Sequence, residues 1–315
     1  MRPQRLGSIR GAGSILVLAA AVLWGTVGPV QVWADTGDDP VALGSARILI
    51  GGLALALLAV VSRARLRPLL TPKVWPWLLL AAVATGIYQA GFMFSVERTG
   101  AALATAVALG VAPAATGLFA RLVDRDSLGL PWLLGTLAAV AGCVLLLAPG
   151  TSRVDAAGIS FGIVSGICYG IYTVAAKRLT THQVSMPAAV AVTLIVGGLI
   201  FSPVLVGNFG DLVDPGSVAL LLWLGLIATA AAYMLFVVGL DRVSASTAGT
   251  LSLAEPLVAA VLGLLVLGEA LTVVSGLGMA LLLSGLVIVS VVRTKPAPAP
   301  DEPLRMPRSA PARPH

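Results

Sequence analysis

One carboxylate stands inside an apolar run that is long enough to cross a membrane. The run from Ala248 to Leu271 reads AGTLSLAEPLVAAVLGLLVLGEAL, with Glu255 near its middle and Pro256 beside it. An acid at bilayer depth is costly to insert and is by default a functional-site hypothesis. Because burial favours the protonated carboxyl group, such an acid suits reversible protonation. Glu255 is therefore a candidate proton or ammonium site, and the alternative is a structural acid bonded to a neighbouring helix.

Arg47 is the other charge well inside an expected span, at a depth of roughly 9 Å. It could snorkel to the surface, pair with Glu255 or bind the carboxylate of a substrate. An unpaired charge near the bilayer centre costs about 3 to over 10 kcal/mol, so we expect neither charge to be unpaired in the resting state. A zwitterion such as an amino acid would suit both, with its carboxylate at Arg47 and its ammonium at Glu255.

Aromatic and polar residues mark the expected wall of a binding cavity. The chain has 4 tyrosines, and each falls inside an expected span. A buried tyrosine needs a partner for its hydroxyl group, which a wet cavity supplies, although each could equally be ordinary packing. We expect spans 1, 3, 6 and 8 to line the cavity, with spans 4 and 9 behind or beside them. Besides Arg47 and Glu255, the candidate substrate-binding residues are Trp24, Tyr88, Gln89, Tyr169, Tyr172, Tyr233 and Ser252.

The elements that must position these residues are membrane helices. The chain of 315 residues is 58% hydrophobic and 11% charged, against roughly 25% charged for a soluble domain. A helix needs about 20 apolar residues to cross the hydrocarbon core. The sequence predicts an all-α membrane protein with ten spans, near 13–33, 41–62, 74–96, 100–121, 130–149, 156–178, 186–206, 217–238, 245–266 and 270–292.

The charges in the loops indicate the orientation of these spans. Cytoplasmic loops carry an excess of Lys and Arg. With ten spans, the basic clusters fall on one side: the N-terminus, the segment 63–73, the end of span 4, the end of span 6 and the start of the C-terminal tail. The other side collects Asp35, Asp38, Asp39, Asp211 and Asp214. Both termini are therefore expected in the cytoplasm.

The sequence also predicts an internal duplication. The frame around Glu255 recurs in Ala104–Leu128, where Pro113 matches Pro256 and Ala112 stands in place of the acid. Both prolines are expected to shape their helices, Pro256 by removing a backbone donor and kinking span 9. Five spans per copy make the second copy enter the membrane from the opposite side, which gives inverted repeats with a site near the midplane. Neither Arg47 nor Glu255 has a charged counterpart in the other copy.

The repeats predict the division of the chain. We expect a cytoplasmic N-terminal tail at 1–11, a first five-helix repeat at 12–150, a second at 155–293 and a disordered Pro-rich cytoplasmic tail at 294–315. Gly135 and Gly142 in span 5, and Gly278 and Gly285 in span 10, lie about two turns apart on one face. These helices are expected to pack at the periphery.

The chain resembles EamA-type members of the drug/metabolite transporter superfamily. The resemblance is carried by Trp24-Gly25, by ARILIGG from Ala46 and by LAEPLVAAVLGLLVLGEAL from Leu253. It implies a transport fold and small organic substrates, often exported. One departure is Asp124-Arg125-Asp126, where the first copy usually resembles the Leu267-Gly268-Glu269 of the second.

The expected function is therefore secondary transport by alternating access. The solute is a small polar or amphipathic organic metabolite, amino-acid-like or drug-like, moved outward across a bacterial plasma membrane. The expected partners are this solute, membrane lipid and, as a coupling ion, protons; the protein is a monomer or homodimer and binds no nucleic acid. The chain has no G-x-x-x-x-G-K-[ST] and no H-E-x-x-H motif, so no metal, cofactor or catalytic residue is expected. The alternatives are a membrane-embedded or lipid-modifying enzyme and a non-transporting membrane sensor or partner.

Overall fold

The first half of the chain forms a series of long helices joined by short loops. The structure, a computed structural model, describes residues 4–147, 155–182, 184–200 and 202–291, and the predicted tail 294–315 lies outside them. Within these residues every regular element is helical. The elements before residue 148 are α1 (Gln4–Gly25), α2 (Val27–Ala34), α3 (Pro40–Val61), the 3-10 helix η1 (Arg67–Leu70), α4 (Trp75–Thr99), α5 (Ala101–Asp124) and α6 (Leu130–Leu147).

The second half contains more interruptions. The helix predicted at 217–238 includes a π-helical segment, and the helix predicted at 245–266 is divided in two. The elements after residue 154 are α7 (Ala156–Thr181), α8 (Met186–Leu199), α9 (Ser202–Gly207), α10 (Phe209–Leu212), α11 (Pro215–Leu222), the π-helix η2 (Trp223–Ala231), α12 (Ala232–Leu240), α13 (Ala245–Leu251), α14 (Ala254–Val266) and α15 (Val273–Val291).

The lengths and composition of the helices fit a multi-pass membrane protein. Among the described residues, 9 helical segments are long and apolar enough to span a bilayer. The seventh predicted span, 186–206, instead holds the shorter apolar helix α8, of 14 residues, followed by α9. Large apolar side chains are exposed around the bundle, including Leu57, Leu133 and Leu277. Exposed apolar surface of this kind is what lipid tails cover.

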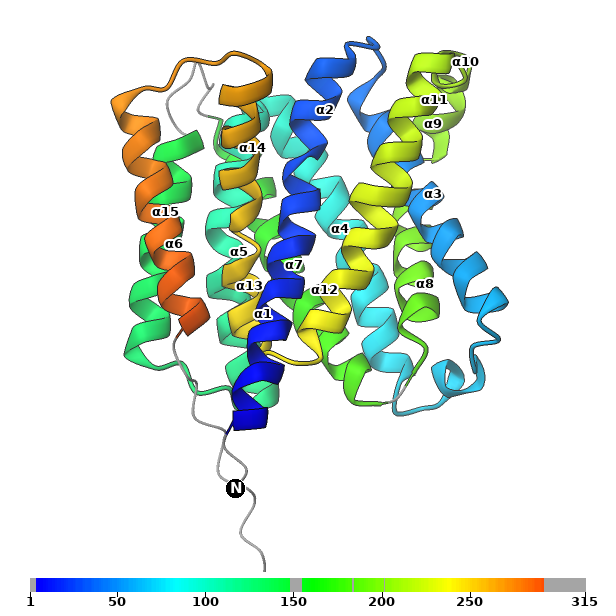
Figure 1. The fold of residues 1–315 in the computed structure, drawn as a ribbon. Coiled ribbons are helices and arrows are strands. Elements are labelled where there is room, and N and C mark those ends of the chain that lie inside the picture. The colour runs from blue at the N-terminus through cyan, green and yellow to red at the C-terminus, as the bar shows by residue number, and fades with distance from the viewer. Residues whose placement is uncertain (1–3, 148–154, 183, 201, 292–315) are drawn as a thin grey trace, which may run out of the picture.

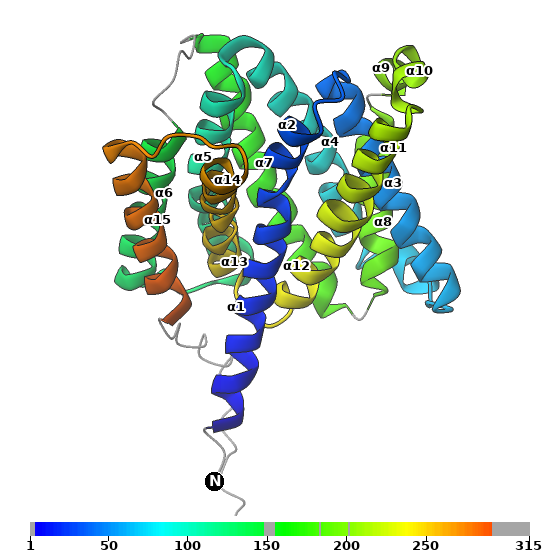
Figure 2. The same cartoon turned by 45° about the horizontal axis from the view of Figure 1, so that its top comes forward.

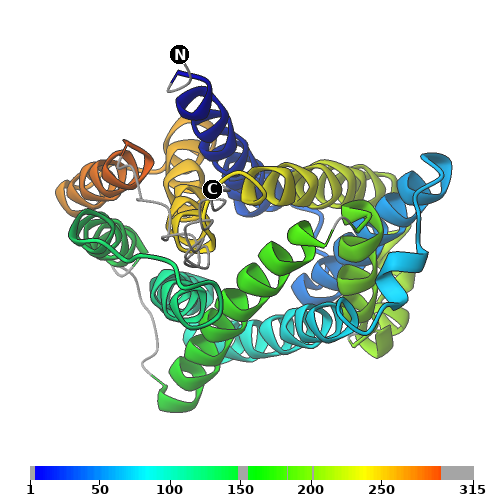
Figure 3. The same cartoon turned by 90° about the horizontal axis from the view of Figure 1, so that it is seen from below.

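The helices run up and down through one bundle, so that α1 begins and α15 ends at the same end (Figure 1). We call this end the base. Seen from the base, α7 runs alongside α4 and α5, while α6 and α15 lie together at one edge (Figure 3). The tilted view shows α1 between the α13–α14 pair and α12 (Figure 2).

The pairing of α6 with α15 confirms the packing predicted from their glycines. A methyl group added at Gly142 would lie 2.6 Å from the carbonyl oxygen of Gly278, and one at Gly285 would lie 2.4 Å from that of Gly135. The two backbones are therefore in direct contact at both glycine pairs. Small residues permit this close approach between membrane helices.

Candidate functional site

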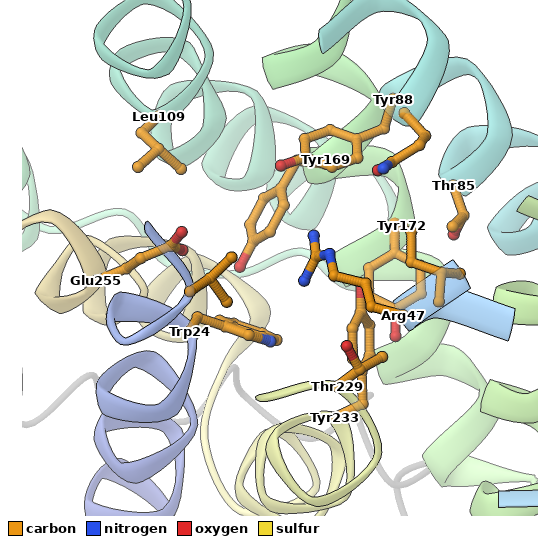
Figure 4. A pocket seen from close by; sticks show the side chains of 13 residues that line it. Trp24, Arg47, Thr85, Tyr88, Leu109, Tyr169, Tyr172, Thr229, Tyr233 and Glu255 are labelled. Atoms are coloured by element: carbon orange, nitrogen blue, oxygen red, sulfur yellow. The ribbon is translucent and has the colours of Figure 1, made fainter. Parts of the chain in front are cut away.

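A cavity in the middle of the bundle collects most of the residues singled out from the sequence. Figure 4 shows them projecting into it from several helices. The lining residues are Trp24, Val27, Arg47, Ile48, Thr85, Tyr88, Gln89, Leu109, Tyr169, Tyr172, Thr229, Tyr233 and Glu255.

The start of α3 fixes the depth of Arg47. The Asp39 side chain caps the helix by accepting hydrogen bonds from the backbone N–H groups of Val41 (3.0 Å) and Ala42 (2.8 Å). Pro40 occupies the first turn, where its missing N–H costs nothing. Arg47 follows the cap by two turns and lies about 12 Å further along the axis. Its guanidinium group thus enters the cavity far from the loop that carries the aspartates.

Glu255 lies in the first turn of a helix that begins inside the bundle. Helix α13 ends at Leu251, and α14 begins at Ala254. Across the break, the N–H of Leu253 donates to Thr250 O and the N–H of Glu255 donates to Ser252 O, both at 3.0 Å. The N-terminus of a helix carries a partial positive charge, which favours a carboxylate in its first turn. The break therefore provides a place for a negative charge at membrane depth.

The sequence predicted a kink at Pro256, and the structure shows an interruption of span 9 before this proline. The helix is interrupted before Pro256, which falls in the first turn of α14, where a proline is tolerated. The Ser252 carbonyl, which a continuous helix would pair with residue 256, instead accepts from Glu255. Its counterpart Pro113 lies inside the uninterrupted helix α5. The two prolines therefore occupy different local structures.

A second interruption adjoins the first. Helix α1 ends at Gly25 and α2 begins at Val27, where a single continuous span was predicted. The Thr26 hydroxyl donates to Leu23 O at 2.7 Å, which satisfies a carbonyl at the end of α1. A methyl group at Gly25 would lie 2.7 Å from the carbonyl oxygen of Glu255. The broken ends of two helices thus meet beside the cavity, an arrangement found at transporter sites.

Close packing of α7 brings two tyrosines into the cavity. Glycines recur every fourth residue along its first part, at Gly158, Gly162, Gly166 and Gly170. A methyl group at Gly166 would lie 2.5 Å from the carbonyl oxygen of Ala108 in α5. The backbones are thus in contact, and Tyr169 and Tyr172 project from the same helix into the cavity. The Tyr169 hydroxyl donates to Ser252 Oγ at 2.7 Å, at the break before α14.

Aromatic rings join three helices at one side of the cavity. The ring of Tyr233 lies 5.9 Å from that of Tyr172 and 5.4 Å from that of Trp24, both near edge-to-face. The Trp24 ring also packs on Phe236, whose side chain is fully buried. These rings from α1, α7 and α12 therefore pack together along one side of the cavity.

Arg47 and Glu255 point into the cavity from opposite sides, with their charged ends directed toward each other (Figure 4). Within the described part of the chain, no salt bridge or hydrogen bond joins either side chain to another group. This contradicts the prediction that neither charge would be unpaired in the resting state. The cavity therefore presents one cation and one anion whose partners must come from elsewhere.

All of the predicted substrate-binding residues except Ser252 line the cavity. Ser252 contacts Tyr169 from behind and does not line the cavity. The expectation that span 9 lies behind or beside the cavity is wrong, because Glu255 lines it; Arg47 of span 2 and Leu109 of span 4 do so as well. The lining residues missed from the sequence are Val27, Ile48, Thr85, Leu109 and Thr229.

Thr229 escaped prediction because its position depends on a π-helix. Its hydroxyl donates to Leu224 O, five residues back, at 2.7 Å. The wider π turn changes which residues face the cavity, and such turns frequently occur at functional sites. A hydrophobic run alone does not reveal this change of helical register.

The side chains around the cavity suit binding more than covalent chemistry. Among the described residues, no group of three or more His, Cys, Asp or Glu side chains is arranged to hold a metal ion. The arrangement can bind a cation at Glu255, an anion at Arg47 and apolar or cationic groups on the aromatic rings.

Comparison with known proteins identifies the family. The sequence model of the EamA-like transporter family matches the chain twice, over residues 11–148 and 156–291. The chain is 38% identical over 286 residues to the uncharacterised transporter YwfM of Bacillus subtilis, covering 90% of this chain and 95% of that protein. It is 32% identical over 198 residues to the threonine/homoserine exporter RhtA of Escherichia coli K12, covering 62% of this chain and 64% of RhtA.

A solved structure supports the same fold. It is described only as a crystal structure of a protein, and it superposes with a TM-score of 0.72 over 88% of this chain and 95% of that one, at 21% identity. With the double family match, this likeness agrees with the helical inverted-repeat architecture expected from the sequence. The chain belongs to the EamA-like transporter family, a family of multi-pass membrane proteins that act on small-molecule solutes.

Proposed function

We propose that the protein is a secondary transporter that exports a small zwitterionic metabolite of the amino-acid type by alternating access. The observation that carries this proposal is the pair of unpartnered charges, Arg47 and Glu255, which face one cavity from opposite sides. A zwitterion supplies an anion and a cation in one molecule. Its carboxylate binds Arg47, and its ammonium group binds Glu255.

The free-energy cost of burying two opposite charges supports this choice of solute. A charge in a medium of low polarity is expensive without a partner, so the site favours a ligand that neutralises both charges together. A purely cationic ligand leaves Arg47 unpaired, and a purely anionic one leaves Glu255 unpaired. The site therefore discriminates by the balance of charge, and the aromatic rings of Trp24, Tyr172 and Tyr233 accommodate the rest of the molecule.

One relative supports the same class of solute. RhtA is named as an exporter of threonine and homoserine, which are zwitterions at neutral pH. We take L-threonine as the first probe for this chain. Glu255 also provides a group that can exchange a proton, so we propose that protons drive export.

The charges of the loops at the two ends of the bundle support an orientation of the protein in the membrane. Arg63, Arg65, Arg67 and Lys73 belong to the loop at the base, whereas Asp35, Asp38 and Asp39 belong to a loop at the opposite end (Figure 1). By the positive-inside rule, we place the base and both termini in the cytoplasm of a bacterium. The membrane is then the plasma membrane.

Uptake and counterflow in proteoliposomes test this function. Vesicles containing the purified protein should exchange radiolabelled L-threonine or another zwitterionic amino acid faster than protein-free vesicles, and a pH gradient should change the rate. Exchange of no solute from a panel of amino acids would remove the substrate assignment. If the vesicles exchange only amines or only carboxylic acids, the substrate is of that class and not a zwitterion.

A further inference from the structure

Two consecutive cationic residues, Lys177 and Arg178, lie near the end of α7 at the base of the bundle. Each of them contacts a different helix. Lys177 Nζ donates to the carbonyl oxygens of Leu240 (2.6 Å) and Asp241 (3.1 Å), at the end of α12. Arg178 instead reaches α5. Near its end at the base, α7 is therefore bonded to α12 through Lys177 and to α5 through Arg178.

The contact of Arg178 with α5 is an ion pair in partly buried surroundings. Arg178 Nε lies 2.6 Å from Asp124 Oδ1, and the side chains are 33% and 17% exposed. Arg178 also donates to Val123 O, and its guanidinium group lies 5.8 Å from the centre of the Trp77 ring in α4. One side chain from the second half of the chain thus contacts two helices of the first half.

A second polar contact crosses between the halves nearby. Ser246 Oγ, in the first turn of α13, donates to Asp126 Oδ2 at 2.9 Å. Trp132 Nε1, in α6, donates to Ser246 O at 3.2 Å. The segment Asp124–Asp126 is thus held by both α7 and α13.

Of the two acids in this segment, Asp124 has no acidic counterpart in the second repeat. The corresponding residues of the second copy are Leu267, Gly268 and Glu269. There the Glu269 carboxylate packs against Gly263 of its own hairpin, where an added methyl group would lie 2.3 Å from Oε2. The two corresponding hairpins are therefore held by different contacts.

We propose that the Arg178–Asp124 ion pair and the Ser246–Asp126 hydrogen bond form a latch, which keeps the base closed beneath the cavity and opens when solute passes between the cavity and the base. Arg178 follows Tyr172 on one continuous helix by six residues, about 9 Å. A movement of α7 that displaces the cavity tyrosines therefore also pulls Arg178 from Asp124. The inference rests on the proposed function only in taking the cavity as the solute site.

Labelling of a cysteine in the cavity tests the latch without any solute. Thr85→Cys, in a background with Cys143→Ala and Cys168→Ala, places a thiol on the cavity wall. A membrane-impermeant maleimide is added from each side of the membrane in turn. Adding Asp124→Asn should raise the labelling rate from the base side about fivefold, the shift expected for loss of one partly buried ion pair.

The other end of the bundle supplies a matched control. Arg98 and Asp155 form an ion pair there at 3.8 Å, with side chains 50% and 40% exposed. Arg98→Gln breaks this pair and should leave base-side labelling unchanged. Equal labelling of the Asp124→Asn and Arg98→Gln variants would overturn the latch.

A double-mutant cycle separates a latch from a general loss of packing. If Asp124 and Arg178 act as a pair, Asp124→Asn/Arg178→Gln should label within about twofold of either single variant. If the two substitutions instead raise the labelling rate by factors that multiply in the double variant, the residues act independently and the pairing is wrong. If Asp124→Asn does not fold, Ser246→Ala provides the second route: it should raise base-side labelling, and an unchanged rate would count against the proposal. Because labelling requires no transport, a failed flux assay leaves this result intact.

Discussion

Gly25 lies directly against the carbonyl oxygen of Glu255, which packs the broken end of α1 onto the broken start of α14. The contact joins the turn that carries Trp24 to the turn that carries the carboxylate. Residues from the two ends of the chain thereby form one side of the cavity. The position of Glu255 depends on the absence of a side chain at residue 25.

Replacing Gly25 by Ala should therefore disturb both stability and function. The added methyl group would lie 2.7 Å from both Glu255 O and Val258 Cβ. We expect a loss of about 1–3 kcal/mol in the free energy of unfolding, typical of overpacking, and slower transport. Gly28→Ala is the control, because its methyl group meets nothing within 4 Å. Unfolding in detergent measures both variants, and equal stability would contradict the contact.

Glu255→Gln should fold but transport slowly, with no response to a pH gradient. The substitution keeps the shape of the side chain and removes its charge and its proton exchange. Glu97→Gln, at the exposed end of α4, is the matched control and should behave like the parent protein. Flux in proteoliposomes at two pH values measures the effect. An unchanged rate and pH dependence would remove Glu255 from coupling, and a variant that fails to fold would favour a structural role.

Arg47→Gln should weaken the binding of a zwitterion by about 10- to 100-fold, the effect of losing one charge-assisted hydrogen bond. Arg47→Lys should recover part of this loss, because it keeps the charge without the planar pair of donors. Equilibrium binding of labelled L-threonine to purified protein measures both variants. Equal affinity of Arg47→Gln and the parent protein would exclude a direct contact between Arg47 and the solute.

Gly142→Ala should destabilise the protein without changing solute affinity. A methyl group there would lie 2.3 Å from the backbone nitrogen of Leu282, so α6 and α15 must separate. Neither helix lines the cavity. Gly110→Ala is the control, since its methyl group would lie at an ordinary 3.7 Å from Val140. A change in affinity as large as that of Arg47→Gln would show that the edge pair is coupled to the site.

The sequence predicted the helices well because apolar length and loop charge determine membrane spans. It also predicted that α6 and α15 are packing helices outside the site, since two glycines on one face of a helix permit close approach of a neighbour; it did not predict that the two helices pack on each other. Arg47 and Glu255 were identifiable because a charge in an apolar run is rare. These features depend on residue type and spacing along a single helix.

The interruptions and the polar contacts could not be predicted in the same way. The break at Thr26 involves no proline, because a local turn satisfies the freed carbonyl group of Leu23. Pro256 indicated a kink in span 9, but residue type alone did not show that the helix is interrupted before Ala254. The π-helix that turns Thr229 into the cavity lies in a uniformly apolar run. The absence of an ion pair between Arg47 and Glu255 is a fact of tertiary distance, which residue type alone does not determine.

Transport of matched derivatives of one amino acid tests the two-charge site most directly. Proteoliposomes would be given L-threonine, its methyl ester and its N-acetyl form, which carry both charges, only the cation and only the anion. The account predicts that L-threonine, or another zwitterion from the panel, is exchanged at least about tenfold faster than either of its derivatives. It also predicts that Arg47→Gln and Glu255→Gln each abolish this preference. Equal exchange of all three forms, or a preference that survives both substitutions, would contradict it.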